Sequence, residues 1–181
     1  MRITGENGTA YRLGEPMHVY DAEHLLGVID PVRVSRDGSE VRIERFVPSR
    51  HVKTGKRNFG PLVLLEVTLY LATHFRGVQM VSFSLNREIE MHGDGMQVAV
   101  ARSELLHGIG AESITISPRP DSSIPGNFVV EGEWAYNPAN LAALEECLLR
   151  ERSGYRARAP DSTGLPAPLR WLRRLMRGAG R

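Results

Sequence analysis

Hydrophobic and polar positions along the chain predict strands that alternate with helices. An apolar-rich stretch, LLGVIDPVRV, covers residues 25–34, and the turn residues Asp37-Gly38 follow it and lead into SEVRIERFV. This order predicts a β-hairpin. Within its second strand Val41 and Ile43 share one face, but Phe46 falls out of phase. A one-residue slip of this kind indicates either a β-bulge or the end of the strand.

The next periodic segment predicts a buried helix. Gly60-Pro61 opens it, and proline suits the first helical turn because no N–H is needed there. Leu62, Leu65 and Leu69 form one apolar stripe, which further apolar residues widen until Gly77. A helix that is apolar nearly all round is expected at the centre of the fold.

The remaining pattern completes a mixed architecture. It predicts a strand at residues 78–85, a helix at 96–107, strands at 113–117 and 128–136, and a last helix after Asn137-Pro138. The order β-β-α-β-α-β-β-α predicts an α/β (α+β) fold with a mixed, mostly antiparallel central sheet and flanking helices. We expect three parts: a flexible arm at 1–16, one domain at 17–152, and a tail at 153–181.

Composition agrees with one globular domain, and charge is divided unevenly along it. The chain has 181 residues, of which 41% are hydrophobic, enough for a sizeable core. Nine arginines and two acidic residues give residues 150–181 a net charge of +7, which leaves −5 for residues 1–149. The single cysteine, Cys147, excludes an internal disulfide, and the six histidines are scattered without ligand spacing, so we expect no metal.

The termini bear on location. No apolar signal region is visible at the start, and no apolar run reaches the roughly 18 residues that a transmembrane helix needs, so a cytoplasmic protein is expected. The tail holds a Pro/Gly-rich linker and then PLRWLRRLMR, a basic amphipathic pattern at 168–177. It suits the inner membrane surface or an acidic protein partner; nucleic-acid contact and a disordered solubilising end are the alternatives, although the acidic body argues against nucleic acid.

A basic loop separates the hairpin from the buried helix. Its four cations and two glycines are Arg50, Lys53, Gly55, Lys56, Arg57 and Gly60. Backbone N–H groups at a helix N-terminus attract anions, so the loop is a candidate anion site. The alternative is a solvated turn whose charges bind nothing specific.

Several of these motifs resemble one family. The strand Arg42-Ile43-Glu44-Arg45-Phe46, the ARSELLHGIGA helix end and the ISPRPDSSIPG loop are similar to segments of GNAT-fold acyltransferases. More narrowly, they resemble acyl-homoserine-lactone (autoinducer) synthases, which make quorum-sensing signals, and N-acyl amino acid synthases. The segment ahead of the Arg-Phe strand is shorter than in that branch, and YDAEH, with Asp21 and Glu23, echoes the acidic element found there.

The resemblance implies a GNAT-like fold and an N-acyltransferase without a tightly bound cofactor. It would move an acyl group from acyl-coenzyme A or acyl carrier protein to a small amine, and a homodimer is a further expectation. The basic loop would hold the donor's phosphate or dock the acidic carrier. The other interpretation is a catalytically idle relative that binds an acyl ligand or a protein.

The resemblance also assigns roles to residues on two strands. Acyl transfer needs a proton acceptor and polarisation of the thioester carbonyl. Glu44 is the expected base, and Ser82 and Ser84 would bind the carbonyl. The expected substrate-binding residues are Arg45, Phe46 and Phe83, although a cleft filled by either phenylalanine would argue against transfer. The alternative for Arg45 is an ion pair on an exposed sheet face, and for Glu44 and the serines a plain sheet surface.

Overall fold

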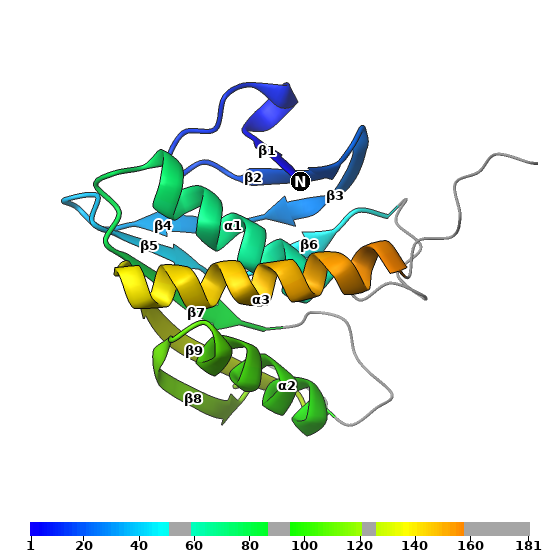
Figure 1. The fold of residues 1–181 in the computed structure, drawn as a ribbon, viewed down its shortest axis with the longest axis vertical. Coiled ribbons are helices and arrows are strands. Elements are labelled where there is room, and N and C mark those ends of the chain that lie inside the picture. Colours follow the sequence, from blue (N-terminus) through cyan, green and yellow to red (C-terminus); the bar gives the residue numbers. More distant parts are fainter. Residues whose placement is uncertain (51–58, 87–94, 121–125, 158–181) are drawn as a thin grey trace, which may run out of the picture.

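The computed structural model describes residues 1–50, 59–86, 95–120 and 126–157 (Figure 1). Its elements in chain order are β1 (Arg2–Thr4), the 3-10 helix η1 (Glu6–Gly8), β2 (Met17–Asp21), β3 (His24–Ile29), β4 (Val32–Val34), β5 (Glu40–Ile43), β6 (Phe46–Pro48), α1 (Gly60–His74), β7 (Met80–Leu85), α2 (Gly95–Gly108), β8 (Glu112–Pro118), β9 (Phe128–Ala135) and α3 (Pro138–Ala157). None of the helices within these ranges is both long and apolar enough to cross a lipid bilayer.

The strands form two sheets. The first has the order β1-β2-β3-β6 and is antiparallel throughout. The second has the order β4-β5-β7-β9-β8, in which only the β5–β7 pair is parallel. The predicted mixed, mostly antiparallel architecture with flanking helices is therefore confirmed.

Two chain segments each contribute one strand to each sheet, and the points where they change sheet lie side by side. The 24–34 segment breaks between β3 and β4, and the 40–48 segment breaks between β5 and β6, at Glu44-Arg45. The two breaks face each other: the Asp30 N–H donates to the Arg45 carbonyl (3.1 Å), and Arg45 Nε donates to the Asp30 carbonyl (3.2 Å). The slip of phase at Phe46 thus marks the point where the strand changes sheet.

One face of the second sheet is apolar and carries the helices. The strand register puts Val41, Val81 and Trp134 in one row and Ile43, Phe83 and Gly132 in the next, and all six are buried. Figure 1 shows α1, α2 and α3 on the same side of this sheet. The Trp134 indole N–H donates to the Ile109 carbonyl just after α2 (2.8 Å), which satisfies the one polar group of this side chain.

The opposite face is polar, because alternate residues of a strand point to opposite sides. The side chains of Glu40, Arg42, Ser82, Ser84 and Glu131 lie there. No described helix covers this face, which we call the open face. It holds Ser82 and Ser84, two of the residues to which the family resemblance assigns a role.

The hairpin turn between β4 and β5 is fixed by one carboxylate. Asp37 Oδ1 accepts hydrogen bonds from the hydroxyls of Ser35 (2.7 Å) and Ser39 (2.8 Å) and from the Ser39 N–H (3.2 Å). These bonds favour the ionised form and lower the pKa of Asp37 to about 2.

Three features differ from the expectations. The expected arm at 1–16 contains β1, which pairs with β2, and neither strand follows from the pattern because both are short and their outward residues vary. The last helix continues to Ala157, past the expected boundary at 152. On α1, Glu66 is buried with a residue exposure of 8%, although the helix was expected to bury apolar residues.

Candidate functional site

The end of β7 lies where the two sheets separate. Pairing between β5 and β7 stops at Ile43 and Phe83, and the chain then leaves as β6 to pair with β3. β7 continues to Leu85 with β9 alone on its other side. Among the described strands nothing pairs with β7 beyond Phe83 on the side of β6, and we call this divergence the fork.

The first turn of α1 stands beside the fork. Phe59 immediately precedes the helix, is 5% exposed, and its ring meets that of Phe46 edge to face at 5.9 Å between centroids. The N-cap residue, Phe59, makes no side-chain hydrogen bond to the helix start. The first N–H groups of a helix have no intrahelical acceptor, and the helix dipole adds partial positive charge there. The fork therefore adjoins a helix end that favours an anion.

Phe46 also packs on the neighbouring strand. A Cβ added at Gly27 of β3 would lie 2.6 Å from Phe46 Cζ, so the ring occupies the space that any larger residue at Gly27 would need. Phe83 is 1% exposed and belongs to the core beneath the helices. Of the two phenylalanines expected to bind substrate, Phe46 lies at the fork and Phe83 lies in the interior.

An ion-pair network crosses the open face next to the fork. Arg42 on β5 reaches over β7 to Glu131 on β9, with 2.8 Å between Nη2 and Oε1. Glu44 Oε1 lies 2.7 Å from Arg33 Nε and 3.6 Å from Arg42 Nε. The carboxylate expected to act as base is thus neutralised by two guanidinium groups.

The two serines on β7 differ in their partners. The buried Ser82 hydroxyl donates to Glu40 Oε1 at 2.7 Å. Ser84 is half-buried, and in the described part of the chain its hydroxyl has no hydrogen-bond partner. Ser84 is the serine that a ligand on the open face can reach without displacing a protein contact.

The structure describes Arg45, which was expected to bind substrate, but only part of the basic loop. Arg45 Nε donates to the Asp30 carbonyl across the two strand breaks, so Arg45 links the segments that change sheet. Arg50 is exposed, and Gly60 is the first residue of α1. Lys53, Gly55, Lys56 and Arg57 lie outside the described residues, as does the basic segment 168–177.

The acidic pair in YDAEH has structural partners. Asp21 Oδ2 accepts a hydrogen bond from the Tyr155 hydroxyl on α3 (2.6 Å), and Glu23 Oε2 lies 3.5 Å from Arg2 Nη2 at the surface. Both carboxylates lie on or beside the first sheet. The structure does not bring them to the fork.

Two residues at the end of β7 were missed by sequence reasoning. Arg102 on α2 donates to the Leu85 carbonyl at 3.1 Å, and the buried Asn86 Oδ1 has no partner among the residues described. A polar residue directly after an apolar strand was the available signal for Asn86. No group of three His, Cys, Asp or Glu residues within the described ranges is placed to hold a metal ion.

Comparisons with known proteins give a weak structural likeness. No protein-family model matches the sequence, and no curated protein matches it significantly. Mutant forms of the spermidine/spermine N-acetyltransferase SpeG from Vibrio cholerae are 12% identical, with a TM-score of 0.43 over 77% of this chain and 72% of that one. The CoA-dependent acyl-homoserine lactone synthase MesI is 10% identical, with a TM-score of 0.43 over 81% of this chain and 77% of that one.

Proposed function

We propose that the protein is a GNAT-type acyltransferase, which moves an acyl group from a coenzyme A or acyl-carrier thioester to a small amine. The observation that carries this proposal is the fork, where an edge of β7 with which no described strand pairs lies beside the first turn of α1. The first feature offers hydrogen-bonding groups to an extended amide-bearing arm, and the second offers an anion site.

The donor would lie along the fork. The amides of its pantetheine arm pair with the β7 edge beyond Phe83, as an added strand would. A backbone N–H at this edge polarises the thioester carbonyl and stabilises the oxyanion that forms during transfer. The phosphate sits near Gly60, where the basic residues from Arg50 to Arg57 join it in our proposal.

The acceptor amine would approach from the open face. Its nitrogen attacks the thioester carbon, the C–S bond breaks, the thiolate leaves, and the amine's proton passes to a base. Ser84 is available to orient the reacting groups. Glu44 is the carboxylate beside the fork, and a bound acceptor would rearrange its ion pairs with Arg33 and Arg42.

The finer assignment follows the resemblance of the Arg-Phe strand to autoinducer and N-acyl amino acid synthases. In that proposal the acyl group is fatty, the carrier protein docks on the basic loop, and residues 168–177 contact the inner membrane surface or an acidic partner.

A catalytically idle binding protein is the second candidate. The Glu44 carboxylate and the Ser82 hydroxyl are both committed to protein partners, and Phe46 and Phe59 pack together at the mouth of the fork. Such a protein would keep the donor site and bind an acyl ligand or a partner without turnover.

Two measurements on the same sample separate the candidates. Calorimetry with acetyl-, octanoyl- and palmitoyl-coenzyme A, and with acyl carrier protein, tests donor binding. Thiol release with a panel of small amines tests transfer. Binding with thiol release supports the enzyme, binding without release supports the idle protein, and no binding of any donor overturns both. Ser84→Ala is the site variant, and Ser117→Ala on β8 is a serine control away from the fork.

A further inference from the structure

One buried polar atom at the fork has no protein partner. Asn86 directly follows β7, and its side-chain Oδ1 is withdrawn from water without a hydrogen bond to any described residue. A buried carbonyl oxygen that lacks a donor costs free energy, so native structures rarely keep one without a use. The two other such atoms in the described part of the chain belong to Tyr11 and His18, which lie outside β7 and the fork.

The backbone immediately before Asn86 is held in place. Leu85, the last residue of β7, pairs with Val130 on β9, and its carbonyl accepts a hydrogen bond from Arg102 Nη1 at 3.1 Å. Alternate residues of a strand point to the same side, so Asn86 follows Ser84 on the side of the open face. The Cα atoms of these two residues are roughly 6.7 Å apart, which is the rise of two residues in a strand.

Polar side chains along this row of β7 change from satisfied to unsatisfied at the fork. The Ser82 hydroxyl donates to Glu40 Oε1 at 2.7 Å, where β5 still pairs with β7. Beyond the end of that pairing, neither the Ser84 hydroxyl nor Asn86 Oδ1 has a hydrogen-bond partner among the described residues. A few convergent polar groups without protein partners are typical of a ligand site, where they fix the orientation of the ligand.

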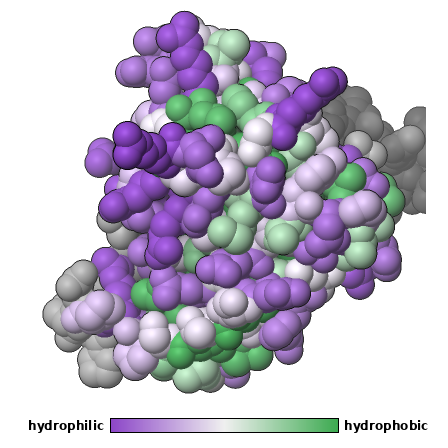
Figure 2. Space-filling view, turned by 90° about the vertical axis from the view of Figure 1, so that its left-hand side faces the viewer, coloured by the Kyte–Doolittle hydropathy of each residue, from purple (hydrophilic) through white to green (hydrophobic). Residues whose placement is uncertain are grey.

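The opposite end of the same sheet satisfies its polar groups. β7 begins at Met80, beside Glu40 and the β4–β5 turn, and runs from there toward the fork. In that turn the Asp37 carboxylate accepts three hydrogen bonds. Figure 2 views the molecule from this end, and hydrophilic residues cover much of its surface, where water completes their hydrogen bonds. Asn86 Oδ1 has neither the water nor the neighbours.

The donor and the acceptor would meet different groups of β7. The donor's arm pairs with backbone groups, which lie in the plane of the sheet, whereas side chains project out of that plane. We propose that Asn86 Oδ1 accepts a hydrogen bond from a second polar group of the acceptor, a hydroxyl or an N–H, and this inference rests on the proposed function. Ser84 orients the attacking amine, so the preferred acceptor is an amine with another hydrogen-bond donor roughly 6–7 Å from its reactive nitrogen.

Two amines of nearly equal size test this assignment. 4-Amino-1-butanol carries a hydroxyl at about the required distance, and pentylamine has a methyl group in its place. With pentylamine bound, Asn86 Oδ1 stays buried without a donor. The natural sequence should therefore use the amino alcohol with a kcat/KM at least about tenfold higher. Thiol release, with the tightest-binding of the three acyl-coenzyme A donors, measures both rates.

Asn86→Leu removes the oxygen and keeps a side chain of similar size. The preference for the amino alcohol should disappear, while the affinity for the donor, measured by calorimetry, should not change. Because an apolar group replaces a buried acceptor that has no partner, the melting temperature should rise by about 2–4 °C. Asn86→Asp keeps an oxygen at the same place and should retain the preference.

Asn140→Leu is the matched control, because this asparagine is also half-buried but has a protein partner. Its side-chain Nδ2 donates to the Ala135 carbonyl at 2.9 Å. This variant should lower the melting temperature, since it leaves that carbonyl without its donor, and it should leave the preference between the two amines unchanged.

The outcomes separate this assignment from the proposed function. If the natural sequence releases no thiol with any donor and amine, both are overturned. Equal use of the two amines, a preference that survives in Asn86→Leu, or a loss of donor affinity in that variant would each overturn the assignment of Asn86 and leave acyl transfer standing. A melting temperature that falls in Asn86→Leu would overturn it as well, because the asparagine would then stabilise the free protein.

Discussion

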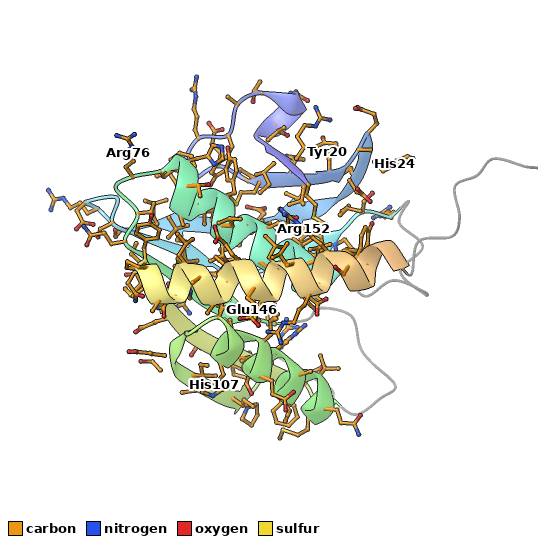
Figure 3. The ribbon with its side chains drawn as sticks, viewed as in Figure 1. Tyr20, His24, Arg76, His107, Glu146 and Arg152 are labelled. Carbon is orange, nitrogen blue, oxygen red and sulfur yellow. The ribbon has the colours of Figure 1, made fainter. Side chains whose placement is uncertain are left out.

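Two glutamate–arginine pairs with similar short distances occupy contrasting surroundings. Glu66 on α1 accepts hydrogen bonds from Arg152 Nε (2.8 Å) and Nη2 (2.9 Å) on α3, and the Glu66 side chain is 9% exposed. Glu131 on β9 accepts one bond from Arg42 at 2.8 Å on the open face, with side-chain exposures of 44% and 41%. Figure 3 shows Arg152 on α3 where that helix passes α1.

Because the two ion pairs differ in burial, we expect them to have different roles. The bidentate interaction of Arg152 with Glu66 joins α3 to α1. It raises the pKa of Arg152 because the guanidinium donates hydrogen bonds to that carboxylate. The Arg42–Glu131 pair is partly exposed to water, where Coulomb attraction is weak. Replacing one partner by a charged ligand therefore costs little free energy. We infer that the buried pair maintains the fold and that the open-face network can rearrange around a substrate.

Removal of the Arg152 side chain should produce the largest change in stability. Arg152→Ala leaves a mostly buried carboxylate without its main partner, so we expect a loss of about 2–3 kcal/mol in the free energy of unfolding. The partial exposure of Arg152 and the Met1 α-amino group, 3.7 Å from Glu66, keep the loss below that of a fully buried pair. Urea denaturation measures it.

The double change Glu66→Leu with Arg152→Leu is the control for that prediction. It removes both charges and keeps apolar bulk, so most of the lost stability should return. If the double variant is as unstable as Arg152→Ala, the burial of an unpaired charge is not the cause of the loss.

A second contact anchors the same helix end. Tyr155→Phe removes the hydroxyl that donates to Asp21, a half-buried carboxylate on β2, and should cost about 1 kcal/mol. Thermal unfolding of this variant beside Tyr136→Phe, which changes an exposed tyrosine hydroxyl, measures the difference. Equal melting temperatures would show that the bond contributes nothing.

On the open face the same chemistry should matter little for stability. Arg42→Ala should change the free energy of unfolding by no more than about 0.5 kcal/mol. In the proposed enzyme it should alter the rate of acyl transfer, because it frees Glu44 and Glu131 from a shared cation. If urea denaturation shows a loss above about 1.5 kcal/mol in the free energy of unfolding, this network also maintains the fold, and the two pairs do not differ as proposed.

The smallest effect concerns Asp37, a fully exposed carboxylate. Its pKa in the folded protein is about 2 against an ordinary 3.8, so its contribution to stability is present above pH 4 and disappears as the pH falls toward 2. Carbon NMR of the carboxyl group should record the low pKa. Asp37→Asn should lose less stability than the natural sequence between pH 5 and pH 2.5; an equal loss would contradict the assignment.

Local signals predicted the fold where short-range physics decides it. The Asp37-Gly38 turn, the buried stripe of α1 and the phase slip at Phe46 all lie within a few neighbouring residues, and the structure confirms each. β1 and β2 were missed because strands of three and five residues are too short to show a recognisable alternation of apolar and polar residues.

The site was harder to predict because its contacts are distant in sequence. Arg42 and Glu131 are 89 positions apart, and Glu66 and Arg152 are 86 apart. A glutamate in an apolar helix indicates that a cationic partner must exist, but the neighbouring sequence does not identify that partner. The family resemblance assigned Glu44 and Ser82 to one site, but it did not reveal that Arg33 and Glu40 engage them.

In our proposal, the fork binds the thioester arm of an acyl donor. The most direct test is an amide NMR titration of the full chain with octanoyl-coenzyme A, with dephosphorylated pantetheine as the second ligand. We predict saturable shifts at Ser84, Leu85 and Asn86 with both ligands, and at Leu62 and Val63 with coenzyme A alone. An absence of shifts, or shifts confined to residues away from β7 and the start of α1, would contradict the account.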